Sequence, residues 1–314
     1  MDFIYLLIAC AFFALQFIFQ KLFEKRTVGG LSVCLWNQIV CCIVGGTFLI
    51  VKAGGSLLFT PVTVPALIYA LLYSASGMIC SVATISAMGC GSVGSIGTYC
   101  LAGGMIVPFI YGIFALGEEA GLFKWLGILV LCASLVPSVM GKSGDSGKKT
   151  SVRFVVYSVI VFLTNGLVSV FSKMHQISPA AISEDGFMFL SAGIRFSAGL
   201  AIILALASVK RMRGEKEAYR NAFWNIARVP MTGKLFVLLF AVAGAFSVCN
   251  TLGNLFSLRC MVTMDASIQF PILSAVVIVL TALFGRMFFG EKITKGSAVS
   301  LIMSVAGIGL FMIP

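Results

Sequence analysis

The chain has 314 residues, of which 60% are hydrophobic and only 11% are charged, and its formal net charge is +11. A soluble globular protein is about half apolar and about one-quarter charged, so this chain carries too little charge to cover a surface that faces water. Its positive charge does not indicate nucleic-acid binding, because the basic residues lie between apolar runs, where the positive-inside rule of membrane proteins places them. The composition therefore excludes an ordinary soluble domain and predicts an integral membrane protein.

Ten runs of mainly apolar residues follow one another along the chain, and a helix of about 20 such residues crosses the hydrocarbon core of a bilayer. They cover residues 3–22, 32–51, 66–88, 93–116, 122–140, 154–173, 187–209, 235–258, 266–289 and 297–313. The first run is too long for a secretory signal peptide, has no basic segment before it, and is not followed by a cleavage site of small residues. The sequence thus predicts an all-α membrane protein with ten transmembrane helices.

Two polar stretches separate these runs. Residues 141–153 are rich in Gly, Ser and Lys, which is typical of a flexible linker. Residues 210–234 form either a solvated loop or a short amphipathic helix on the membrane surface, with Tyr219, Phe223 and Trp224 as interfacial residues.

The basic residues are distributed unevenly between the two ends of the predicted helices. Seventeen of the 22 Lys and Arg residues lie in the connections after the odd-numbered helices, four lie on the opposite side, and Arg195 lies within a helix. Cytoplasmic connections carry the excess of Lys and Arg. This distribution predicts that the odd connections are cytoplasmic and that both termini are outside.

The two halves of the chain are similar to one another. A Gly-Glu pair ends one apolar run at Gly117-Glu118 and another at Gly290-Glu291, and Lys21 and Lys173 each follow a Phe near the end of the first helix of a half. The predicted units are a five-helix repeat at 1–140, a linker at 141–153 and a second five-helix repeat at 154–314. Because five is odd, the second repeat is inverted relative to the first, which is a transporter architecture with a substrate site near the midplane.

Four apolar segments carry polar residues in a recurrent order and spacing. They are ALGEEAGLFKWLGILVLCASL (115–135), AGIRFSAGLAIILALA (192–207), SIQFPILSAVV (267–277) and FFGEKITKGSAVSLIMSVAGIGLFMI (288–313). Together they resemble the drug/metabolite transporter superfamily in its ten-helix form, with two EamA-type halves, over essentially the whole chain. The resemblance implies a secondary transporter in which the first four helices of each half surround a cavity and the fifth lies at the periphery. Many members have cytoplasmic termini, whereas the loop charges here predict the opposite.

Arg195 lies near the middle of the run 187–209, about 12 Å along the helix from its start. A cation at that depth is costly unless it faces a cavity or a partner. Two interpretations stay open. Arg195 contacts an anionic or zwitterionic substrate, or it has a structural role in which it bonds helix carbonyls or extends past Glu184 and Asp185.

Neutral polar residues occur in several predicted helices of both halves. Any one of them is more often an interhelical hydrogen bond than a ligand contact, but a set spread over several helices favours a polar central cavity. The candidate substrate-binding residues are Arg195, Asn37, Gln38, Thr98, Tyr99, Asn165, Asn250, Asn254 and Gln269.

Carboxylates are confined to helix ends and connections. Glu118 and Glu291 precede predicted helices, and a carboxylate there caps the free N–H groups, so we expect both to be structural caps. Because no carboxylate lies at mid-membrane, proton-coupled export of hydrophobic cations is disfavoured. The ten cysteines contain no CxxC pair and there is one histidine, His175, so neither a metal site nor a catalytic residue is expected.

We therefore expect a secondary transporter of small metabolites, either an exporter or a facilitator, working by alternating access on zwitterionic or anionic solutes such as amino acids. The alternatives are a membrane-embedded enzyme and a non-transporting membrane subunit; acid–base catalysis usually requires a His or a carboxylate pair, which the apolar runs lack. The expected partners are a small-molecule solute and the lipid bilayer of a bacterial-type cytoplasmic membrane. No cofactor and no nucleic acid are expected, and the protein is a monomer or a homodimer.

Overall fold

In the computed structural model, the described residues are 2–27, 31–88, 93–140, 152–212, 232–290, 295–311 and 313. Their regular secondary structure is helical. The elements are α1 (Asp2–Glu24), α2 (Leu31–Lys52), η1 (Ser56–Phe59), α3 (Val64–Met88), α4 (Val93–Leu116), α5 (Leu122–Met140), α6 (Val152–Ile177), α7 (Glu184–Met212), α9 (Gly233–Thr263), α10 (Ala266–Phe289) and α11 (Lys295–Phe311). Each predicted apolar run matches one of the long helices to within a few residues.

Three sequence-based expectations fall on residues that are not described. Most of the predicted linker (141–151), the central part of the polar stretch 210–234 (213–231) and Glu291 lie outside the described residues.

Eight of the described helices are long and apolar enough to cross a membrane, namely α1 to α4, α6, α7, α9 and α10. The apolar parts of the other two, Leu122–Ser134 in α5 and Ala298–Phe311 in α11, are shorter. A helix satisfies its own backbone N–H and C=O groups, which is required wherever the surroundings are lipid. The protein is a helical, multi-pass integral membrane protein.

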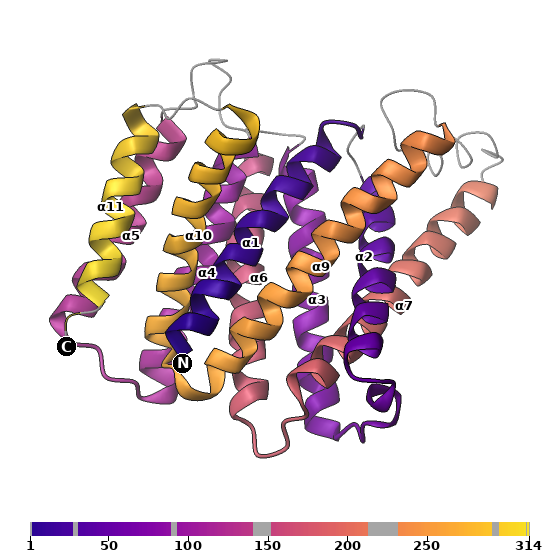
Figure 1. Cartoon of the computed structure of the whole chain (residues 1–314), viewed down its shortest axis with the longest axis horizontal. Coiled ribbons are helices and arrows are strands. Elements are labelled where there is room, and N and C mark those ends of the chain that lie inside the picture. The colour runs from indigo at the N-terminus through magenta and orange to yellow at the C-terminus, as the bar shows by residue number, and fades with distance from the viewer. Residues whose placement is uncertain are drawn as a thin grey trace.

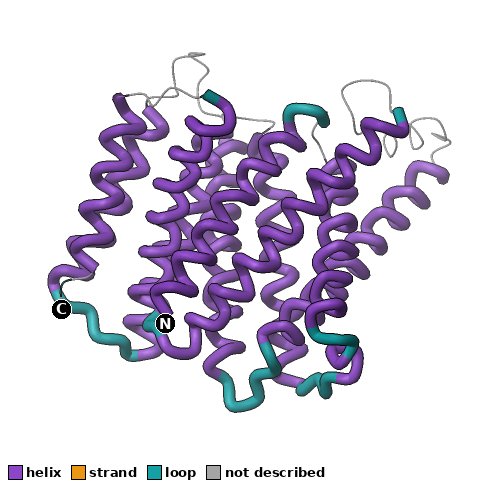
Figure 2. Tube along the Cα trace, in the orientation of Figure 1, coloured by secondary structure: helices purple, strands orange, loops and turns teal. Residues whose placement is uncertain are grey.

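The long helices pack as one bundle, and both ends of the described chain lie at the same end of it (Figure 1). We call this the terminal end. The connections 53–63, 117–121, 178–183 and 264–265 also lie there, as the teal loops of Figure 2 show. At the opposite end, α1, α3, α5, α7 and α10 finish.

Helices that are distant in the sequence pack against one another. α1 packs along α9 and α10, and α6 packs along α3 and α4. α2 contacts α7 and α9, α3 contacts α7, and α4 contacts α10. α5 packs on α11 at one edge of the bundle, as the family resemblance implied (Figure 1).

Glycines allow α4 and α6 to approach closely. A Cβ atom at Gly103 would collide with the backbone carbonyl of Phe162, and one at Gly166 would collide with the side chain of Val107. Small residues at such contacts are typical of helix packing in membranes, where close van der Waals contact drives association.

Buried apolar side chains form two large clusters toward the terminal end. One joins α1, α4, α5, α9, α10 and α11, and we call the other the terminal-end cluster. It joins α2, η1, α3, α7, α9 and α10, and includes Phe187, Leu258 and Met261. At the opposite end the described buried residues form two separate, smaller clusters, one of α1, α2 and α9 and the other of α3 and α6.

Candidate functional site

Arg195 lies in the interior of the bundle, about 16 Å along α7 from Glu184. Its guanidinium stacks on the ring of Tyr73 in α3, with 4.6 Å from Cζ to the ring centroid. One turn further along α3, Gly77 leaves room for the guanidinium, because a Cβ there would lie 3.0 Å from an Nη atom. Tyr73 is only 3% exposed and Arg195 is half-buried, so the guanidinium packs against a buried ring of α3.

No hydrogen bond or ion pair joins Arg195 to another described residue, and its buried Nε has no hydrogen-bond partner. Asp185, toward which the side chain was expected to extend in a structural role, instead accepts a hydrogen bond of 2.6 Å from Lys52. A guanidinium stays protonated in proteins. The bundle therefore holds a half-buried cation at mid-depth that no described carboxylate neutralises.

A chain of polar side chains leads from Tyr73 across the bundle. The Tyr73 hydroxyl donates to Asn254 Oδ1 at 3.4 Å, Asn254 donates to Asn250 Oδ1 at 3.3 Å, and Asn250 donates to Gln16 Oε1 at 2.8 Å. These residues belong to α3, α9 and α1. Each lies about 14 to 21 Å along its helix from the terminal end, so the chain runs at mid-depth.

The structure thus brings three predicted site residues, Arg195, Asn250 and Asn254, into one polar region. It adds Tyr73 and Gln16, which sequence reasoning did not include among the candidates. Gln16 offered a signal, since it is a polar residue in an apolar run. Tyr73 offered none, because a tyrosine in such a run is ordinarily a packing residue.

The remaining candidates form no described hydrogen bond with this polar chain. Asn37 and Gln38 contact the thiols of Cys41 and Cys42 within α2. Asn165 donates to the carbonyl of Cys100 at 2.7 Å and so joins α6 to α4.

The last three candidates pack or bond with residues outside the polar chain, or are not described in full. Tyr99 is 42% exposed and packs edge-on against Phe154. Gln269 donates to the carbonyl of Ser257 at 2.8 Å, and its own buried Oε1 has no partner. Thr98 belongs to α4, and its side chain is outside the described part of the structure.

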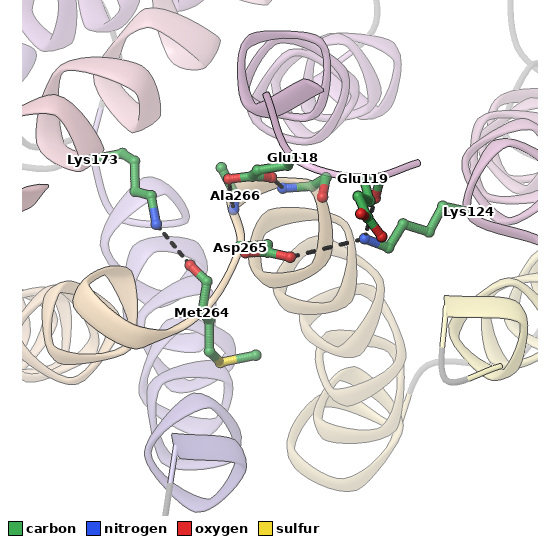
Figure 3. Close-up of polar contacts among 8 residues, drawn as sticks. Glu118, Glu119, Lys124, Lys173, Met264, Asp265 and Ala266 are labelled. Carbon is green, nitrogen blue, oxygen red and sulfur yellow. Dashed lines mark hydrogen bonds and ion pairs between the residues drawn. The ribbon is translucent and has the colours of Figure 1, made fainter. Parts of the chain in front are cut away.

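Glu118 is a helix cap, but of a different helix from the one expected. Its two carboxylate oxygens each accept a backbone N–H at 2.7 Å, from Ala266 and Ser267 at the start of α10 (Figure 3). The expectation that it caps the following helix, α5, is wrong, because Gly117 adopts a positive φ of 69° and turns the chain toward α10. The cap therefore joins the first half of the chain to the second.

Lys173 and His175 near the end of α6 are also structural. Lys173 is 5% exposed and donates to the carbonyls of Met261 and Met264 at 2.6 and 2.7 Å, which caps the end of α9 (Figure 3). His175 is fully buried and stacks on Phe187 with centroids 4.1 Å apart. Among the described residues, no three His, Cys, Asp or Glu side chains are placed to share a metal ion.

A separate groove of about 590 Å³ lies between η1, α3 and α7. It is lined mainly by apolar side chains such as Leu58, Val62 and Leu71, which are exposed. Arg195 is not among its lining residues. Exposed apolar residues of this kind are the ones that face lipid in a membrane protein.

Comparison with known proteins adds the fold alone. No family model matches the chain, and no curated protein matches it. One solved crystal structure, described only as that of a protein, is 14% identical and superposes with a TM-score of 0.65 over 98% of this chain and 95% of the other. The same bundle has therefore been observed in a protein of very different sequence.

Proposed function

We propose that this protein is a secondary transporter of small metabolites that carry a negatively charged group, with Arg195 as the residue that contacts it. The observation that carries the proposal is the unneutralised guanidinium at mid-depth in the bundle. A cation inside a membrane protein marks a substrate or ion pathway unless it is paired, and no described carboxylate pairs with this one.

The proposal includes the architecture of the drug/metabolite transporter superfamily: ten membrane-spanning helices in two inverted repeats. The packing of the helices supports it. Suppose that each helix of the first half (α1 to α5) is exchanged, in order, with its counterpart in the second half (α6, α7, α9, α10 and α11). The contact of α1 with α9 then becomes the contact of α6 with α3, and the contact of α1 with α10 becomes the contact of α6 with α4. The contacts of α2 with α7, α4 with α10, and α5 with α11 are unchanged. A two-fold axis in the membrane plane would produce this pattern.

The polar chain also suits a transporter. It joins Arg195 and Asn254 of the second half to Tyr73 and Gln16 of the first half. In inverted-repeat transporters the substrate site lies near the midplane, between the repeats. A site at this position changes its surroundings when one half moves relative to the other.

The test is uptake by proteoliposomes of a panel of amino acids and organic anions. We expect Arg195→Gln to reduce uptake about tenfold to a hundredfold, since a hydrogen bond to a charged group contributes about 1.5–3 kcal/mol. Arg195→Lys keeps the charge but loses the planar fork of donors, so it should be less impaired.

The matched control is Arg259→Gln. Arg259 also lies over a tyrosine ring, that of Tyr5 at 6.0 Å, but it is exposed near the end of α9. All variants are compared at equal insertion and equal thermal stability. Unchanged uptake by a stable Arg195→Gln protein would contradict the role of Arg195, and no uptake of any panel member by the wild-type protein would contradict transport.

A further inference from the structure

Next to Arg195, the contact between α7 and α3 holds a second buried donor without a partner. Ser191 lies one turn before Arg195 on the same face of α7 and is 1% exposed. Its Oγ forms no hydrogen bond, while its carbonyl accepts one from Ser74 of α3 at 3.2 Å. Ser191 and Arg195 therefore both lie where α7 faces α3, and Nε of Arg195 is the other unpartnered polar atom there.

Unpartnered buried donors are unusual. Most buried polar side-chain atoms are hydrogen-bonded, so each exception requires an explanation, such as a bound ligand. A serine in a helix commonly bonds the carbonyl four residues earlier, as Ser197 does with Gly193 at 2.9 Å. Ser191 does not use this ordinary solution.

Each amide oxygen of the neighbouring polar chain already accepts one hydrogen bond. Asn254 Oδ1 accepts from Tyr73, Asn250 Oδ1 accepts from Asn254, and Gln16 Oε1 accepts from Asn250. The neighbourhood therefore offers a cation and a hydroxyl as donors. An ammonium group carries three further donors and no acceptor, and among the described residues no carboxylate stands beside Arg195 to receive them.

We propose that Ser191 and Arg195 together bind one carboxylate of a small organic acid, and that the site prefers such acids to the matching amino acids. The inference rests on the proposed function, because it takes Arg195 as the substrate contact. Ser191 donates its hydroxyl to one carboxylate oxygen and the guanidinium donates to the other. Tyr73, whose hydroxyl donates to Asn254, lies against a face of the guanidinium and leaves its in-plane N–H groups for the carboxylate.

The test is binding to the purified full-length protein in lipid nanodiscs. The probes are three pairs that share a side chain: pyruvate and alanine, 4-methyl-2-oxopentanoate and leucine, and 2-oxoglutarate and glutamate. We expect the oxo acid to bind more tightly in every pair. Ser191→Ala should weaken oxo-acid binding about tenfold, the loss of one hydrogen bond to a charged group.

Stability separates this role from a structural one. Removing a buried hydroxyl that has no partner should leave the unfolding temperature of the ligand-free protein unchanged or raise it. The control is Ser197→Ala, which removes an exposed hydroxyl that bonds within its own helix, and it should bind the oxo acids normally.

Two glycines provide a second pair of variants. Gly77→Ala places a methyl group 3.0 Å from an Nη atom and 3.3 Å from Cζ of Arg195, so the guanidinium must shift. Gly193→Ala, on α7 itself, meets nothing within 4 Å. We expect Gly77→Ala to weaken binding of the oxo acids and Gly193→Ala to leave it unchanged.

Equal or tighter binding of the amino acid in the pairs, unchanged affinity in Ser191→Ala, or no binding of any oxo acid at millimolar concentration would each overturn this inference. None of these results decides the proposed function, which depends on the effect of Arg195→Gln on uptake. A transporter that loses uptake in Arg195→Gln but not in Ser191→Ala would keep the function and lose the carboxylate site described here.

Discussion

At the terminal end of the bundle, the first half of the chain (residues 2–140) meets the second (152–313) through hydrogen bonds and ion pairs. At the opposite end, where several connections lie outside the described residues, the described contacts between the halves include aromatic pairs and lysines over an aromatic ring. The terminal-end contacts are Glu118 with the N–H groups of Ala266 and Ser267, Lys52 with Asp185 at 2.6 Å, Thr63 with the carbonyl of Ala180 at 2.9 Å, and Lys124 with Asp265 at 3.9 Å.

The opposite end uses different chemistry. Trp36 of α2 packs edge-on against Phe236 of α9 with centroids 6.3 Å apart. Lys21 and Lys25, at the end of α1, each lie 4.6 Å from the ring of Phe289 in α10. The two apolar clusters behind these contacts are smaller than the terminal-end cluster.

The two kinds of contact respond differently when one half of the chain moves relative to the other. Hydrogen bonds weaken steeply when their geometry changes, whereas apolar contacts are non-directional. We therefore expect the hydrogen bonds of the terminal end to resist separation of the halves more than the described aromatic contacts of the opposite end do.

The largest expected effect comes from breaking the strongest contact of the terminal end. Glu118→Ala removes two charge-assisted hydrogen bonds and the cap of α10, and should lower the free energy of unfolding by about 3 kcal/mol. The measurement is unfolding in mixed detergent micelles. Glu118→Gln keeps an acceptor oxygen and should lose about half as much.

The control for this prediction is the neighbouring Glu119→Ala. Glu119 is exposed, and in the described structure only its backbone carbonyl is used, by Lys124. If the two alanine variants have the same free energy of unfolding, Glu118 does not hold the terminal end together. The proposed difference between the two ends would then be contradicted.

The positions of the helices could be predicted from the sequence because a bilayer constrains them to long apolar runs. Their ends could not, because caps from other helices set them. α9 continues past its predicted end to Thr263, where Lys173 of α6 bonds the last carbonyls. The presence of a cap at Glu118 was predictable from a carboxylate beside a helix start, but the identity of the capped helix depends on tertiary packing.

The candidate site was predictable to a similar extent. An arginine within an apolar run and repeated asparagines are visible in the sequence, and Arg195, Asn250 and Asn254 do lie in one polar region. The sequence could not show which of the other polar residues bond within their own helix, as Gln38 does. Nor could it show that Ser191 lacks a hydrogen-bond partner, because that depends on the position of every residue around the hydroxyl.

A smaller effect is expected from Gly112→Ala, which acts on the same contact through space alone. A Cβ at Gly112 would collide with an Oε atom of Glu118 and lie 3.1 Å from the backbone nitrogen of Ser267. We expect a loss of about 1–2 kcal/mol, since overpacking typically costs about 1–3 kcal/mol and alanine is the better helix former.

Gly309→Ala is the control for that substitution, because it lies in a helix and meets nothing within 4 Å. It should leave the free energy of unfolding unchanged or raise it. A Gly112→Ala protein as stable as Gly309→Ala would mean that the carboxylate of Glu118 can move aside at no cost.

The smallest effect is expected at Lys52 and Asp185, although their 2.6 Å contact is short. Their side chains are 36% and 24% exposed, and an exposed ion pair contributes only about 0.2–1 kcal/mol, because water screens the charges and two long side chains lose freedom. A double-mutant cycle of Lys52→Gln and Asp185→Asn should give a coupling energy in that range, decreasing as salt is added. The same cycle shows whether this ion pair helps to hold the terminal end together. A coupling that is several times larger and insensitive to salt would mean that this pair, like Glu118 on α10, is shielded from water and holds α2 against α7. A small, salt-sensitive coupling leaves the caps and the terminal-end cluster as the contacts that hold this end together.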